Sequence, residues 1–126
     1  MHENEIAAMV VDAAYQLHRM YGPGLLETAY RNALAFDLRE LGLDCRTEVL
    51  VPMFHRNREL GTAYRADLII ENLVIVEVKA TEHISPVHQR QVLTYLRLTG
   101  LRLGLLVNFG GETIKEGLSR VVNNLR

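Results

Sequence analysis

Residues 64–79 constrain the fold more than any other part of the chain, because charged residues lie inside two apolar stretches there. Residues 64–70 and 73–79 have the length and composition of single strands. Side chains alternate between the two faces of a strand, so Glu77 and Lys79 share one face and the intervening valines share the other. Buried charges need a partner or a metal ion. The segment therefore predicts paired strands with a charged site on one face.

The length of the loop between these two strands decides whether Asp67 joins the site. A three-residue loop, 71–73, sets Asp67 opposite Glu77 and Ile70 opposite Val74. This register gathers the apolar residues on one face, whereas a two-residue loop would mix the aspartate with the valines. The two carboxylates are then expected to converge beside the lysine.

Converging carboxylates with a neighbouring ammonium group predict a divalent metal site. The carboxylates repel each other unless a cation lies between them, and hard oxygen ligands with room for water suit Mg²⁺, with Mn²⁺ as a substitute. Such a metal lowers the pKa of a bound water, and Lys79 could stabilise the resulting hydroxide or offset charge on a phosphate under attack. The backbone carbonyl of Val78 is a further candidate ligand. The alternative is a surface ion pair, since a Glu-x-Lys triplet is common by chance.

The rest of the chain predicts an α/β sandwich with a mixed sheet. Apolar residues that recur every three or four positions indicate helices, and a Ser-Pro pair is a typical helix start. The order is helix, helix, three strands, helix, strand. The tail from Glu112 is ambiguous, and a short strand around 118–122 is an open alternative. The predicted helices are 3–20, about 26–41 and 86–99, and the predicted strands are 47–54, 64–70, 73–79 and 103–109.

Length and composition limit the class of protein. A chain of 126 residues fits one domain, residues 1–126. The lone Cys45 and the lack of zinc-type spacing predict a reducing compartment, the cytoplasm, and no apolar run approaches the roughly 20 residues of a membrane span. Fourteen basic against fifteen acidic side chains give a net charge of −1, so contact with nucleic acid must be local.

The segment Gly24–Tyr30 carries the pattern GxxExxY. With this and further motif stretches, the chain resembles the GxxExxY protein family of bacteria and archaea, which is grouped with the PD-(D/E)xK nuclease superfamily. The resemblance implies a restriction-endonuclease-like sandwich whose mixed four-stranded sheet is flanked by helices. One position departs from the superfamily's usual motif, because Ala66 stands where Pro precedes the aspartate. The further stretches are 64–67, 75–79, 88–91, 95–96 and 104–109.

The resemblance also implies roles for individual residues. Asp67 and Glu77 correspond to metal ligands, Lys79 to the catalytic lysine, and Glu27 to an acid that reaches the metal from a helix. An acid in the first turn of a helix also offsets the helix dipole, which is the alternative explanation for Glu27. Tyr30 lies one turn further along the same helix and is expected to pack in the core.

The helix predicted at 86–99 supplies one more candidate. Gln91 and Tyr95 are four residues apart, so they share a face, and the pair is similar to a Gln-x-x-x-Tyr motif that faces the site in RecB-like members. Gln91 is therefore a candidate catalytic residue. The alternative is a solvated Gln91 and a Tyr95 that packs in the core. His18 and His88 have no assigned role, although each lies near a motif and could contact phosphate.

These observations favour a Mg²⁺-dependent nuclease that hydrolyses phosphodiester bonds of DNA, with RNA less favoured. The alternative is a catalytically silent module that retains the nuclease fold and binds nucleic acid or protein. A third interpretation is a structural domain whose charges form ion pairs. A domain this small offers limited contact area, so a homodimer or a partner subunit is consistent with nucleic-acid binding.

Overall fold

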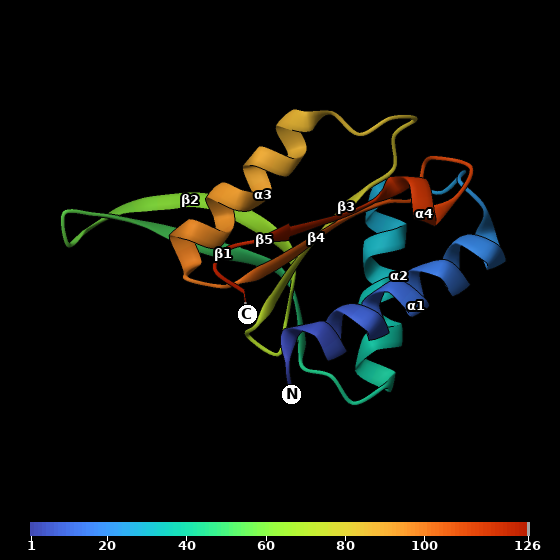
Figure 1. The fold of residues 1–126 in the computed structure, drawn as a ribbon, viewed down its shortest axis with the longest axis horizontal. Coiled ribbons are helices and arrows are strands. Elements are labelled where there is room, and N and C mark those ends of the chain that lie inside the picture. Colours follow the sequence, from blue (N-terminus) through green and yellow to red (C-terminus); the bar gives the residue numbers. More distant parts are fainter. Residues whose placement is uncertain (126) are drawn as a thin grey trace.

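The computed structural model describes residues 1–125 and forms one mixed sheet with helices on both faces (Figure 1). The strands are arranged in the order β1-β2-β3-β4-β5, in which β3 and β4 are parallel and all other neighbours are antiparallel. The predicted α/β architecture is therefore confirmed. The elements are α1 (Glu3–Tyr21), α2 (Glu27–Glu40), β1 (Cys45–His55), β2 (Arg58–Ile70), β3 (Val74–Lys79), α3 (Pro86–Thr99), β4 (Leu103–Asn108), α4 (Ile114–Gly117) and β5 (Leu118–Val122).

The sheet has five strands, so the predicted four-stranded sheet is one strand short. The additional strand, β5, pairs antiparallel with β4 from Leu103 opposite Val122 to Val107 opposite Leu118. Every residue of β4 is buried, and a buried strand cannot leave one row of backbone groups unpaired. The tail therefore forms the short strand that its sequence left as an alternative.

The hairpin of β1 and β2 is longer than the sequence pattern predicts. β2 begins at Arg58 rather than at residue 64, because residues 58–63, although exposed, pair with the end of β1. Arg56 and Asn57 form the turn with φ of +50° and +64°. Figure 1 shows this ribbon projecting beyond the rest of the sheet.

The two faces of the sheet carry different helices. Helices α1 and α2 cover one face, where they bury Leu68, Val76 and Val78 in the main core. Helix α3 covers the other face, where Ile75 packs with Leu96 in a smaller core. Because side chains alternate along β3, its charged residues lie on the α3 side.

The register between β2 and β3 agrees with the prediction. Ile70 pairs with Val74 and Leu68 with Val76 across the three-residue loop 71–73. The first two residues of that loop have φ of +54° and +53°, which allows the tight reversal. The regular β2–β3 ladder ends at the pair of Leu68 and Val76, one residue before Asp67 and Glu77.

Helix α3 lies unusually close to the sheet at Gly104 of β4. A Cβ atom at this position would lie 2.5 Å from Cγ1 of Val92, which is far closer than two carbon atoms can approach. Val92 and Leu96 are both fully buried at this contact. The absence of a side chain at Gly104 therefore sets the spacing between α3 and the sheet.

Tyr30 packs in the core, as predicted, and also fixes the start of α2. Its ring stacks on Phe109 with centroids 4.4 Å apart. Its hydroxyl donates to the carbonyl of Gly22 and accepts a hydrogen bond of 3.1 Å from the N–H of Leu25. These bonds hold the loop before α2, so they fix the first turn of the helix, in which Glu27 lies. Within residues 1–125, no helix is long and apolar enough to cross a membrane.

Replacing Tyr30 with phenylalanine removes both hydrogen bonds and keeps the stacked ring. We expect Tyr30→Phe to lower the free energy of unfolding by about 1–3 kcal/mol, measured by urea denaturation. Tyr15→Phe is the matched control, because Tyr15 lies exposed on α1 and should change stability by less than about 0.5 kcal/mol. Equal effects of the two substitutions would contradict a role for the hydroxyl in holding this loop.

Candidate metal and catalytic site

Asp67 and Glu77 meet where the β2–β3 ladder ends. The Asp67 carboxylate accepts a hydrogen bond of 2.8 Å from the backbone N–H of Val78, and it lies close enough to Glu77 to raise the pKa of that acid. Glu77 is buried with 8% of its surface exposed, whereas Asp67 is half-buried. The aspartate therefore takes the place of a strand carbonyl and contacts the second acid directly.

A local distortion of β2 accompanies this contact. Ala66 packs in the core on the α3 side, but its alternate neighbour Leu68 packs in the core on the opposite side. In a regular strand these two residues would share a face, so the alternation breaks at Asp67. Across the ladder, Glu48 of β1 lies between two regular pairs and has φ of +51°. Arg31 of α2 makes a 3.2 Å ion pair with Glu48 and supports the distorted position.

The environment of Glu77 favours its protonated form in the metal-free protein. Burial is the largest cause, followed by the charge of Asp67, and together they raise the pKa of Glu77 to about 9 although Lys79 acts in the opposite direction. Its Oε1 atom is buried and has no hydrogen-bond partner. A cation at this position would replace the proton and use the unpartnered oxygen, so the carboxylate pair fits a divalent metal.

The carboxylate pair supplies only part of a complete coordination shell. Within residues 1–125, no group of three or more His, Cys, Asp or Glu side chains lies close enough to hold a metal ion. Glu27 is the first residue of α2 and is exposed, so the structure does not bring it to the pair. Its assignment as a ligand stays a prediction, as does that of the Val78 carbonyl.

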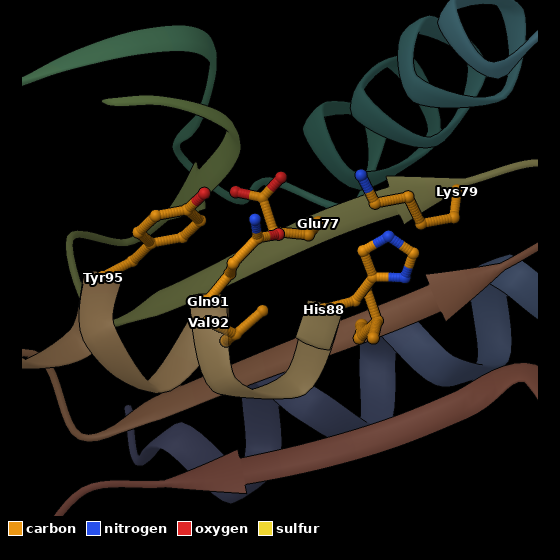
Figure 2. Close-up of a pocket in the computed structure, with 7 residues that line it drawn as sticks. Glu77, Lys79, His88, Gln91, Val92 and Tyr95 are labelled. Carbon is orange, nitrogen blue, oxygen red and sulfur yellow. The ribbon is translucent and has the colours of Figure 1, made fainter. Parts of the chain in front are cut away.

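Helix α3 completes a small pocket beside the carboxylates. The pocket volume is about 20 Å³, which is room for about one water molecule or ion. Figure 2 shows the side chains of α3 directed toward those of Glu77 and Lys79 on β3. Gln91 lines the pocket, as expected from its helical spacing, while its chemical role stays a prediction. The lining residues are Glu77, Lys79, His88, Gln91, Val92, Tyr95 and Leu106.

Tyr95, which lines the pocket, stacks on Tyr64. The rings of Tyr64 and Tyr95 lie 3.6 Å apart and within 7° of parallel. Burial is the main cause of a raised pKa in both, and the charge of Glu77 adds to it. Tyr95 thus lies in the site rather than only in the core. The sequence indicated no role for Tyr64, because its stacking partner comes from an element 31 positions later.

Asn108 is a second residue whose role the sequence left unassigned. It is buried at the end of β4, where its Oδ1 accepts hydrogen bonds from the N–H groups of Thr81 and Gly110, and its Nδ2 donates to the carbonyl of Thr81. These bonds join the segments that leave β3 and β4. The N–H of Phe109 donates to the carbonyl of Lys79 at 2.8 Å, so this network also fixes the lysine. The feature of the sequence that could have identified Asn108 is its position as a polar residue at the end of an apolar strand.

His18 is accounted for by a structural contact. Its Nε2 lies 2.9 Å from the carbonyl oxygen of Gly111, in the loop after β4. Gly111 is not among the residues that line the pocket beside Glu77. His18 therefore holds α1 to this loop.

The raised pKa of Glu77 predicts how the stability of the metal-free protein depends on pH. Glu77 binds a proton up to about pH 9 when folded but only up to its ordinary 4.5 when unfolded. The folded state then binds more protons between these values, so the free energy of unfolding falls as pH rises, by up to about 1.4 kcal/mol per pH unit. Glu77→Gln should remove this slope in urea denaturation with a chelator present. Glu40→Gln, which removes an exposed acid, is the control. A slope that persists in Glu77→Gln would contradict the assignment of this pH dependence to Glu77.

Comparisons with known proteins bear on the family and the fold of the chain. A family model described as the PD-(D/E)XK nuclease superfamily matches residues 4–121. The crystal structure of SSO0001 is similar with a TM-score of 0.50 and 20% sequence identity, over 93% of this chain and 67% of that one. At this identity the similarity concerns the fold alone. Comparison with curated proteins gives no match. The narrower resemblance to GxxExxY proteins stays a prediction.

Proposed function

We propose, from the premise that the chain belongs to the PD-(D/E)XK nuclease superfamily, that it is a metal-dependent nuclease. The observation that carries the proposal is the contact between Asp67 and Glu77, with a buried, unpartnered oxygen on Glu77. Lys79 lies on the same face of β3, two residues further on, and lines the same pocket. Nucleic acid is the substrate class, with DNA ahead of RNA. Mg²⁺ is the proposed metal, and Mn²⁺ could substitute.

Each residue of the site has a separate part in the proposed reaction. Asp67 and Glu77 would hold the metal, with water molecules and the Val78 carbonyl as further ligands. When bound, the metal supplies an activated water and offsets charge on the phosphate. Lys79 offsets the charge that builds on the phosphate oxygens during attack. Gln91 would orient the attacking water or the phosphate through its amide group.

Glu27 could join the site only after a change of side-chain conformation or when the metal is bound. Its backbone is fixed by the hydrogen bonds of Tyr30, so the adjustment would fall on the side chain. An exposed glutamate has the rotamer freedom for such a change. This proposal gives the GxxExxY pattern a physical meaning, since the tyrosine holds the loop that carries the acid.

The exposed position of Glu27 also favours a second candidate function. A module that retains the fold and binds nucleic acid or protein without turnover would not need a third acid at the carboxylate pair. The net charge of −1 gives no general attraction to nucleic acid, so a homodimer or a partner subunit would supply the remaining contact surface in either case.

Cleavage assays separate the two functions. We expect the protein to cut single-stranded DNA, duplex DNA or RNA when Mg²⁺ or Mn²⁺ is present, and Glu77→Ala and Lys79→Ala to lose at least about hundredfold in rate. The controls are Glu40→Ala and Lys115→Ala, which remove the same charges from exposed positions on α2 and α4. Equal activity of site and control variants would exclude this site as the source of cleavage. Metal binding without cleavage of any of these substrates would favour the binding module.

Thermal unfolding tests the metal site without relying on turnover. Because a ligand that binds only the folded state stabilises it, saturating Mg²⁺ at about 100 times its dissociation constant should add about 2.7 kcal/mol. Asp67→Asn and Glu77→Gln should abolish this increase, while Glu27→Gln should reduce it only if Glu27 is a ligand. An equal increase in all three variants and the natural chain would place the metal elsewhere.

A further inference from the structure

Apart from Tyr95, whose ring stacks on Tyr64, His88 is the one titratable side chain lining the pocket to which neither the metal nor the lysine chemistry gives a role. Its imidazole extends from the first turn of α3 and points toward Lys79 (Figure 2). It is half-buried and lines the same pocket as Glu77 and Gln91. The role of the His88 ring in the pocket depends on which of its two nitrogens carries the proton.

The start of α3 assigns one of the two ring nitrogens. The backbone N–H of Ser85 donates to Nδ1 of His88 at 3.3 Å, and the backbone N–H of His88 bonds in return to the Ser85 side chain. This is a capping box in which histidine takes the place of the usual Glu or Gln. Because Nδ1 accepts a hydrogen bond, the ring proton lies on Nε2. The cap therefore selects the tautomer that has Nε2–H as a donor.

The Nε2–H donor has no acceptor within the part of the chain that the structure describes. Lys79 and the amide group of Gln91 are further donors on the walls of the same pocket, whereas Glu77 faces them with an oxygen that suits a metal. A phosphate group bound to such a metal carries oxygens that need donors on its other side. In chemical type, the three donors and the carboxylate pair thus match the oxygens and the metal of a metal-bound phosphodiester.

We propose that His88 is a substrate-binding residue that donates from Nε2–H to a non-bridging phosphate oxygen. The proposal rests on the proposed nuclease function and adds a substrate contact that the metal ligands and Lys79 do not supply. The same side chain caps α3 through Nδ1, so the helix start and the phosphate contact depend on opposite sides of one ring.

Three substitutions separate the capping role from the phosphate contact. His88→Gln keeps both an acceptor for Ser85 and an N–H donor, whereas His88→Glu keeps only the acceptor and His88→Ala keeps neither. We expect His88→Gln to retain cleavage within about threefold, and the Glu and Ala variants to lose at least about tenfold. Val87→Glu controls for the added charge, because Val87 is an exposed neighbour in the same turn that does not line the pocket.

The stability of these variants reports on the capping role of His88 rather than on the phosphate contact. The melting temperature should be lowered in His88→Ala and unchanged in His88→Glu, since glutamate is a good capping-box residue. A cleavage rate that follows the melting temperature across the series would overturn the proposal, because His88 would then act only as a cap. A loss confined to variants without the donor supports it.

Nuclear magnetic resonance of the ¹⁵N-histidine-labelled protein tests the contact independently of cleavage. The free protein should show His88 protonated at Nε2 and unprotonated at Nδ1. Addition of oligothymidylate with Ca²⁺ should shift the Nε2 resonance of His88. If the natural chain cleaves nothing but this shift occurs, the nuclease function fails while the phosphate contact stands. If the oligonucleotide binds without the shift, or does not bind at all, the His88 proposal is overturned.

Discussion

The site depends on the unfavourable pairing of two acidic side chains, Asp67 and Glu77, that the fold holds together. Taken alone, the contact between Asp67 and Glu77 destabilises the folded chain, because one of the acids is buried and the other adds its charge. The rest of the structure supplies what keeps them in place: a three-residue loop that sets the register, a distorted strand, and an ion pair from α2 to the distortion. Stability is given up locally to hold these two acids side by side, which is a common arrangement in functional centres.

The helices on the two faces of the sheet have different structural roles. The layer of α1 and α2 forms the main core and fixes the loop before α2 through Tyr30. The layer of α3 contributes little core but most of the pocket wall, including the donors opposite Glu77. The proposed site thus lies on the face of the sheet that has the smaller core. The parallel pair β3 and β4 ends there, and the network of Asn108 joins the two segments that follow.

Local patterns in the sequence were sufficient for most of the fold. Helical periodicity and the Ser85 cap predicted the three long helices, and the alternation of apolar residues predicted the register that brings Asp67 to Glu77. What escaped prediction depends on contacts between distant segments. The strand character of residues 58–63 comes from pairing with β1, and the strand at 118–122, which the sequence left as an alternative, is decided by the unpaired side of β4. The stacking of Tyr64 on Tyr95 has no local signature at all. The place of Glu27 depends on its side-chain conformation, which periodicity cannot supply.

The close approach of α3 to Gly104 sets the width of the pocket beside Glu77. Val92 rests where a side chain of β4 would otherwise be, and it shares its helix with His88 and Gln91. Any residue larger than glycine would lift that helix and move all of its donors away from β3 together. This pocket has room for about one water molecule, so a displacement of α3 by even one atomic diameter would open it to solvent. The size of the pocket is therefore set by the missing Cβ atom of Gly104, on a strand that has no charged residue.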